Sequence, residues 1–342
     1  MVSTAVNFRE TMMRAFPTIG VISAGAWGIA LANIAASAGL DVVLWGRNRE
    51  AMRTLATTRR SARLSGVELT AGIEATSRQS ALSRCDAVLF VPPAQAMREV
   101  ATLFQGSALR PETPLVACAK GIERGANLFM TQVLEQAAPG HPTAILSGPS
   151  FAADVAAGLP TAVTLASADE ALARALCEAL QGPTFRLYYS SDARGVEIGG
   201  AAKNVLAIAC GVASGLGLGP SAGAALVARG FAELLRFGAA YGARPATLMG
   251  LSGLGDLVLT CSTPQSRNFA LGLALGRGES VAQASGGKLA EGASTASALL
   301  QMAAARNVDM PIAASVDAVL AGRLSPREAV GALLSRPVKG ED

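Results

Sequence analysis

Residues 18–39, TIGVISAGAWGIALANIAASAG, contain the pattern that decides the fold class. The apolar run at 18–23 predicts a β-strand, and residues 27–38 show a helical pattern that Gly39 ends. Between the two lies a turn that carries Gly25. A strand that turns directly into a helix is the first half of a β-α-β unit, so we expect a parallel sheet to begin here.

Short apolar strands separated by helical segments continue from this unit to about residue 192. This alternation predicts an α/β fold with a doubly wound, Rossmann-type parallel sheet that has helices on both faces. Ligands of such a sheet bind in the loops at the carboxyl ends of its strands. We expect the strands at residues 18–23, 42–45, 86–91, 115–118, 144–146, 161–166 and 185–188.

The strand pattern stops after residue 192, and the remainder predicts an all-helical domain. A chain of 342 residues exceeds what one hydrophobic core usually organises, which also favours two domains. We therefore divide the chain into a loose N-terminal extension at 1–17, a nucleotide-binding domain at 18–192 and a helical domain at 193–342. The expected helices of this last part are 193–213, 221–241, 246–249, 252–260, 265–275, 294–305 and 313–320.

Composition and charge narrow the class of partner. The formal net charge is +4, but the lysines and arginines are scattered and have no interleaved aromatic residues. This distribution argues against nucleic acid and fits a small phosphorylated molecule. Residues 1–16 lack the apolar core of a secretory signal. The uncharged stretch 204–228 contains Pro220 and several glycines, so we interpret it as buried helices and expect no membrane span.

The five cysteines indicate a reducing compartment. They are odd in number, include no CxxC pair and lie in apolar sequence, so we expect reduced core thiols in a cytoplasmic protein. A catalytic cysteine would need His141, the one histidine, as its base, and that residue lies in a Pro/Gly loop. No group of His, Cys and carboxylate residues has the spacing of a metal site, so no metal is expected.

The turn after the first strand, SAGAWG, matches the dinucleotide fingerprint G-x-G-x-x-G except that Ser23 replaces the first glycine. Gly25 and Gly28 keep the positions for close phosphate approach and close helix packing, and the helix N-terminus can hold a pyrophosphate. Since serine avoids positive φ, we expect a negative φ at Ser23. Close packing of strand and helix without a cofactor is the alternative explanation.

Arg47 follows the second strand, where a protein selective for NAD usually has Asp or Glu against the ribose hydroxyls. A guanidinium at this place can pair with the 2′-phosphate of NADP. We therefore expect NADP to be accepted alongside NAD. The alternative is a surface arginine at the end of a strand.

Hydride transfer to a ketone also needs a group that protonates the forming alkoxide. Lys120, Lys203 and Asp256 stand in unusually uncharged sequence, within AKG, GGAAKN and GLGDL. A buried ammonium held by Asp256 could orient the ketone, donate a proton and leave as a neutral amine. A structural ion pair fits the same residues, so this pattern alone leaves both explanations open.

Ser266, Arg267 and Asn268 offer a hydroxyl, a guanidinium and an amide in succession. Such a set suits a phosphate dianion, because arginine binds phosphate through paired hydrogen bonds. The same three residues could instead cap a helix.

Seven segments together resemble bacterial NAD(P)-dependent glycerol-3-phosphate dehydrogenases, in order along residues 18–338. They are SAGAWGIALA, LWGR, AKGIE, LSGPSFA, GAAKNV, GLGDLVLTC and SRN. The resemblance implies reversible hydride transfer between NAD(P)H and dihydroxyacetone phosphate, giving sn-glycerol 3-phosphate for phospholipid synthesis. It also implies a homodimer.

The resemblance further implies roles for individual residues. Lys203 would be the proton donor and acceptor, with Asp256, Lys120 and Thr260 completing the catalytic group. The implied substrate contacts are Lys120, Gly148, Ser150, Lys203, Asp256, Ser266, Arg267 and Asn268. The implied cofactor contacts, added to Ser23, Gly25 and Gly28 of the turn, are Ala26, Trp27, Arg47, Lys120, Ala152, Arg267, Leu289 and Glu291.

Two segments depart from the family pattern. Ser23 stands where the family has glycine, which could weaken cofactor binding. Residues 218–223, LGPSAG, replace an Asp-Asn pair and a following basic residue, which could alter domain closure or substrate affinity. The alternatives to this family are a related reductase of a β-hydroxyacid and an NADP-binding protein without activity. A dianionic phosphate would depend on Arg267 far more than a monocarboxylate would.

Overall fold

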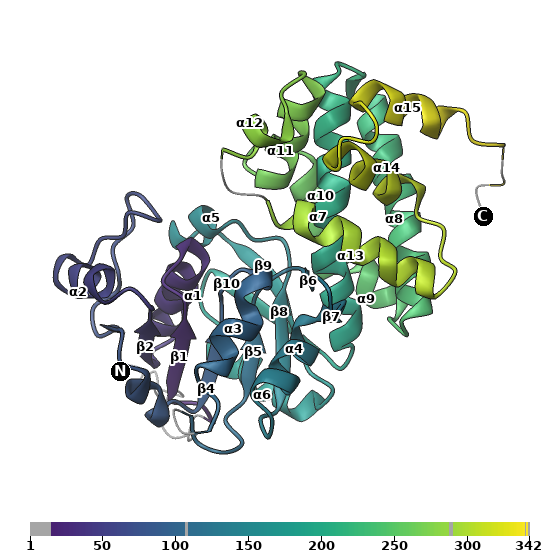
Figure 1. Ribbon diagram of the computed structural model, residues 1–342. Helices are drawn as coiled ribbons and strands as arrows, with labels where there is room; N and C mark the ends of the chain where they lie inside the picture. The colour runs from purple at the N-terminus through teal and green to yellow at the C-terminus, as the bar shows by residue number, and fades with distance from the viewer. Residues whose placement is uncertain (1–14, 107–108, 287–289, 339, 341–342) are drawn as a thin grey trace, which may run out of the picture.

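The computed structural model describes residues 15–106, 109–286, 290–338 and 340. Its main sheet has eight strands in the order β10-β9-β8-β5-β4-β1-β2-β3. Figure 1 shows this sheet with its helices as one lobe and the helices from α7 to α15 as a second lobe beside it. The strands are β1 (Thr18–Ile22), β2 (Asp41–Trp45), β3 (Glu74–Thr76), β4 (Ala87–Phe90), β5 (Leu115–Ala117), β8 (Thr143–Ser147), β9 (Thr161–Ala166) and β10 (Phe185–Ser190).

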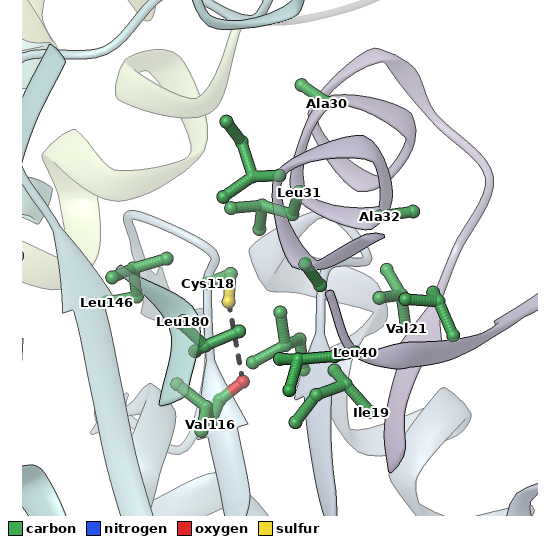
Figure 2. Packing of buried hydrophobic residues seen from close by; sticks show 14 of the residues in the cluster. Ile19, Val21, Ala30, Leu31, Ala32, Leu40, Val116, Cys118, Leu146 and Leu180 are labelled. Atoms are coloured by element: carbon green, nitrogen blue, oxygen red, sulfur yellow. Dashed lines mark hydrogen bonds between the residues drawn. The ribbon is translucent and has the colours of Figure 1, made fainter. Parts of the chain in front are cut away.

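The two faces of the sheet carry separate hydrophobic cores because successive residues of a strand point to opposite faces. In β4, Leu89 packs into one core, whereas Val88 and Phe90 pack into the other. The first core lies under α1 (Ala26–Ser37), and Figure 2 shows Leu31 and Leu180 meeting strand residues there. The helices on this face are α1, α2 (Arg49–Thr58), α5 (Ala152–Ala156) and α6 (Glu170–Leu180), and those on the other are α3 (Met97–Thr102) and α4 (Met130–Ala137), with short 3-10 turns η1 (Gln79–Arg84) and η2 (Ala94–Ala96).

One strand pair departs from the expected parallel arrangement. All neighbours in the main sheet run parallel except β8 and β9, which are antiparallel. The connection between them contains only the five-residue helix α5, which spans about 8 Å, whereas a strand such as β8 spans about 17 Å. The chain therefore does not return to the opposite end of the sheet before β9 begins.

The expected strands are all present, with ends that differ by one or two residues. The sequence pattern did not predict β3, whose triplet EAT has one small apolar residue, or the small hairpin of β6 (Ile122–Glu123) and β7 (Leu128–Phe129). These segments are too short for an alternating pattern to be recognised. All five cysteines are buried with free thiols, as expected; Cys118 donates to the carbonyl of Val116 within the first core (Figure 2).

After β10 the described chain is helical. The helices are α7 (Ala193–Gly215), α8 (Gly219–Ala240), α9 (Pro245–Met249), the π-helical η3 (Leu251–Gly255), α10 (Asp256–Cys261), α11 (Arg267–Gly276), α12 (Val281–Ala284), α13 (Glu291–Ala305), α14 (Pro311–Leu320) and α15 (Pro326–Leu334). The predicted helices of this part are found, but α12 and α15 were not predicted. The first is a single turn, and the second is largely exposed, so neither has a full apolar stripe.

Helix α7 is the centre of the helical part. It packs against α8, α10, α11 and α13. A Cβ on Gly211 would lie 2.2 Å from the carbonyl oxygen of Phe269, and one on Gly272 would lie 2.1 Å from that of Ile208, so the backbones of α7 and α11 touch. Within the described residues, α7 alone is long and apolar enough to cross a membrane, but its apolar window is entirely buried inside the protein.

Candidate active site

A single buried carboxylate joins two lysines that come from different parts of the chain. Asp256, the first residue of α10, is 1% exposed. Its Oδ1 accepts a hydrogen bond from Lys203 Nζ of α7 at 2.5 Å, and its Oδ2 accepts one from Lys120 Nζ at 2.8 Å. Lys203 Nζ also donates to the hydroxyl of Thr260, one turn further along α10, at 2.8 Å. The structure thus brings together the four residues expected to form the catalytic group.

Glycines allow the three elements to approach closely enough. A Cβ on Gly199 would lie 2.5 Å from the carbonyl oxygen of Ser252 in η3, and one on Gly200 would lie 2.6 Å from the hydroxyl of Ser147 at the end of β8. Both glycines lie about one turn before Lys203 on α7. Their missing side chains let that turn press against η3 and β8, which sets how far Lys203 reaches.

The π-helical segment η3 ends where Asp256 begins. A Cβ on Gly253 would lie 1.9 Å from the carbonyl oxygen of Leu248, so only glycine fits this wide turn. Short π-helical segments occur frequently at functional sites. Here the segment determines the direction in which the Asp256 side chain enters the space between the two lysines.

Burial lowers the pKa of Lys203 to about 8. The positive charge of Lys120 acts in the same direction, while the carboxylate of Asp256 opposes both effects. An ammonium with this pKa can release its proton near neutral pH, which an exposed lysine cannot do readily. The arrangement therefore suits a general acid and base.

Lys120 also reaches the loop after β8. Its Nζ donates to the carbonyl oxygen of Gly148 at 2.7 Å, and the hydroxyl of Ser150 donates to the same oxygen at 3.0 Å. Gly148 has a φ of 152°, and a Cβ there would lie 2.8 Å from Cα of Val163. These two expected substrate contacts therefore lie beside Lys120.

The three residues at the start of α11 have different environments. Ser266 caps the helix by accepting a hydrogen bond from Phe269 N, so the alternative explanation of a cap holds for its hydroxyl. Arg267 is exposed and has no ion-pair partner among the described residues. Asn268 is buried, and its Oδ1 accepts a hydrogen bond from Gly292 N at 2.9 Å. One guanidinium is thus free beside an amide that is held in place.

Asn204 was missed by the sequence analysis. Its side-chain amide donates to the carbonyl oxygen of Lys120 at 3.0 Å, and its Oδ1 accepts a hydrogen bond from Asn268 at 2.9 Å. It therefore connects the start of α11 with the backbone of Lys120. Its place directly after Lys203 in the motif GAAKNV was the available signal, but only the fold reveals both partners.

The turn between β1 and α1 corrects one expectation. Ser23 has a φ of +93°, not the negative value that we expected for serine. Its N–H donates to the carbonyl oxygen of Trp45 at 2.9 Å. A Cβ on Gly28 would lie only 1.9 Å from the carbonyl oxygen of Ser23. The close packing of α1 against β1 and the hydrogen bond to β2 thus impose the glycine-like conformation on serine, which costs about 1 to 3 kcal/mol.

The same turn fits a pyrophosphate. Gly25 is the N-cap of α1 and has no side chain to cover the first free N–H groups, so these and the helix dipole can face an anion. Ala26 and Trp27, two further expected contacts, are the first residues of that helix. Ala152 is the first residue of α5 and packs at the edge of the same core as α1.

The remaining expected cofactor contacts include Arg47, Glu291 and Leu289. Arg47 follows β2 and forms an exposed ion pair with Glu99 of α3. Glu291, at the start of α13, accepts a hydrogen bond from Ala94 N at 3.5 Å, and burial raises the pKa of its carboxyl group. Leu289 lies outside the described residues. Residues 218–223, which depart from the family pattern, form the exposed start of α8.

Comparisons with known proteins agree along nearly the whole chain. The family model of the NAD-dependent glycerol-3-phosphate dehydrogenase N-terminus matches residues 18–173, and that of the C-terminus matches residues 192–331. A protein from Azorhizobium caulinodans named glycerol-3-phosphate dehydrogenase (NAD(P)+) is 61% identical over 330 residues, which are 96% of this chain and 100% of that protein. A protein of the same name from Bradyrhizobium diazoefficiens is 58% identical over the same shares.

Solved structures give the same result. The crystal structure of glycerol-3-phosphate dehydrogenase from Coxiella burnetii has a TM-score of 0.89 and 36% identity, covering 94% of this chain and 100% of that chain. A ketopantoate reductase from Ralstonia eutropha has a TM-score of 0.62 and 16% identity, covering 92% of this chain and 99% of that one. This second likeness concerns the fold alone.

Proposed function

Because the chain belongs to the NAD-dependent glycerol-3-phosphate dehydrogenase family, we propose that it interconverts dihydroxyacetone phosphate and sn-glycerol 3-phosphate. It is an NAD(P)-dependent oxidoreductase. The observation that carries the proposed reaction is the buried contact of Lys203 with Asp256, which Lys120 shares. A ketone reductase needs a group that protonates the forming alkoxide, and a buried lysine can serve as that group.

NADPH or NADH, when bound, would supply the hydride for C2 of the ketone. Lys203 donates a proton to the oxygen on that carbon. Because burial lowers the pKa of Lys203 to about 8, its ammonium releases this proton at a small cost in free energy. In the reverse direction the neutral amine accepts the hydroxyl proton. Asp256 and Thr260 hold the Nζ atom and keep its remaining N–H directed away from them.

The phosphate of the substrate is bound at the start of α11. The free guanidinium of Arg267 can form two hydrogen bonds to a dianion. The amide of Asn268 donates one N–H to Asn204, and its Oδ1 accepts a hydrogen bond from Gly292. Its second N–H can therefore donate to the phosphate. Lys120, Gly148, Ser150 and Ser266 complete the proposed substrate site.

The cofactor would bind at the carboxyl ends of β1 and β4, where the strand order reverses. The residues of the turn would hold its pyrophosphate, namely Ser23, Gly25, Ala26, Trp27 and Gly28, and Arg47 would bind at the adenosine ribose. We propose that Lys120, Ala152, Arg267, Leu289 and Glu291 also contact the cofactor. The boundary between the two domains lies near residue 192, between β10 and α7.

We also propose a pathway, a compartment and an oligomeric state for the enzyme, each supported by its family. The product provides the backbone for phospholipids, the enzyme acts in the cytoplasm as a homodimer, and its partners are small molecules rather than nucleic acid. The five buried free thiols fit a reducing compartment.

The test is the oxidation of NADPH in the presence of dihydroxyacetone phosphate, measured as the loss of absorbance of the reduced nicotinamide. Wild type should turn over, Lys203→Ala should be inactive, and Arg267→Ala should lose mainly apparent substrate affinity. If the wild type binds NADPH but oxidises none, the proposed reaction is wrong. Turnover of a β-keto acid, the oxidised form of a β-hydroxyacid, with equal dependence on Arg267 would favour a carboxylate substrate instead.

A further inference from the structure

Arg47 and Glu99 form an ion pair across the expected adenosine site. Arg47 follows β2 by two residues, and Glu99 lies in α3, which follows β4. In the sheet β1 lies between these two strands. The pair therefore spans the end of β1 from one side to the other, over the crevice that holds the adenosine half of a dinucleotide in this fold.

The ion pair is too exposed to be a structural brace. The side chains of Arg47 and Glu99 are 70% and 64% exposed. Exposed pairs of this kind contribute little to stability because water screens both charges. The guanidinium can consequently leave Glu99 for another anion at little cost.

NADP and NAD differ at this place by one phosphate group. The 2′-phosphate carries negative charge and pairs well with a guanidinium, whereas the 2′-hydroxyl of NAD is neutral and can donate to a carboxylate. A carboxylate such as Glu99 repels the 2′-phosphate and competes with it for Arg47. It neither repels the 2′-hydroxyl nor competes with it.

We propose that Glu99 shifts the choice between NADP and NAD toward NAD, because it repels the 2′-phosphate and competes with it for Arg47. The inference rests on the proposed function only for the identity of the cofactor. Glu99 thus explains how a chain with an arginine after β2 can use both nucleotides: the carboxylate opposes the advantage that Arg47 gives to NADP.

The test is direct binding, which needs no turnover. The two tryptophans of the chain, Trp27 and Trp45, lie close to the crevice, so energy transfer from tryptophan to the reduced nicotinamide reports the dissociation constants of NADPH and NADH. Glu99→Gln should tighten NADPH by about three- to tenfold at low salt and change NADH by less than about twofold. In an Arg47→Ala background the same substitution should favour NADPH less than it does in the wild-type background, because the competition for Arg47 is gone and only the repulsion of the 2′-phosphate remains.

Glu68→Gln is the matched control. Glu68 forms an ion pair with Arg60 whose side chains are 64% and 78% exposed, so its substitution changes the net charge of the same domain equally. If Glu68→Gln tightens NADPH as much as Glu99→Gln does, or if Glu99→Gln tightens both nucleotides alike, the inference is wrong. An unchanged NADPH affinity in Glu99→Gln at low salt also overturns it. A wild type that binds both nucleotides without reducing dihydroxyacetone phosphate refutes the proposed reaction, yet still lets the affinity ratio decide the role of Glu99.

Discussion

Lys120 and Lys203 are joined through opposite oxygens of one carboxylate, that of Asp256. The two ammonium groups share this buried carboxylate, so the positive charge of Lys120 favours loss of a proton from Lys203, which is the more deeply buried of the two.

The pH dependence of the two reaction directions should be opposite. Ketone reduction needs the protonated Lys203, so kcat/KM should fall as the pH rises through about 8. Alcohol oxidation needs the neutral amine and should rise through the same value. Lys203→Met should lower both rates by roughly a hundredfold or more while nucleotide binding is retained. Parallel profiles in the two directions would contradict the role of Lys203.

Asp256→Asn should move that pH profile to lower values. The carboxylate raises the pKa of Lys203 against the effect of burial, so its removal lets the pKa fall further. We expect the midpoint of the reductive limb to shift down by about one unit, in addition to a loss of kcat. The profile is measured with NADPH at saturation. An upward shift, or none, would mean that Asp256 only supports the fold.

Arg267→Ala should raise the KM for dihydroxyacetone phosphate by about thirty- to a hundredfold, because a charge-assisted pair with a phosphate is lost. The value of kcat should change much less. Arg277→Ala, at the opposite end of α11 and also exposed, is the matched control and should leave KM unchanged. Equal effects of the two substitutions would indicate general electrostatic attraction instead of a phosphate site.

Sequence motifs predicted the positions of Lys120, Lys203 and Asp256, but not their shared geometry. Short motifs report local conformation, whereas the carboxylate reaches both lysines only through the packing of α7 against η3 and α10. Asn204 was missed for the same reason, since its two partners are 84 and 64 residues away. The alternation of strands and helices predicted the sheet because each strand carries its own apolar run. It could not predict the reversed β9, which depends on the length of the connection before it.

Burial of Glu233 should make stability depend on pH. This carboxylate of α8 is 1% exposed and accepts hydrogen bonds from Ile312 N and Ala313 N at the start of α14. Burial raises its pKa to about 7, so the folded state binds the proton more strongly than the unfolded chain does. Its favourable contribution is complete below the unfolded value near 4.5 and is lost as the pH rises through about 7.

Glu233→Gln should therefore gain stability relative to wild type between pH 5 and pH 8, by roughly 1 to 3 kcal/mol. Urea unfolding at several pH values measures this trend. The exposed Glu279→Gln removes one carboxylate without burial and serves as the control. A difference between Glu233→Gln and wild type that stays constant with pH would show that the carboxyl group does not titrate in this range.

Ser23→Gly should stabilise the protein. Ser23 is held at a φ of +93° because its N–H is bonded to Trp45 O and its carbonyl contacts Gly28. Glycine adopts this conformation without strain, so we expect the free energy of unfolding to rise by about 1 kcal/mol despite the greater freedom of the unfolded chain. Ser37→Gly, at the exposed last residue of α1, makes the same chemical change where φ is helical and should lower stability slightly. If both substitutions lower it, the serine side chain contributes more to the turn than the strain costs, and the family's glycine would not be the better residue in this chain.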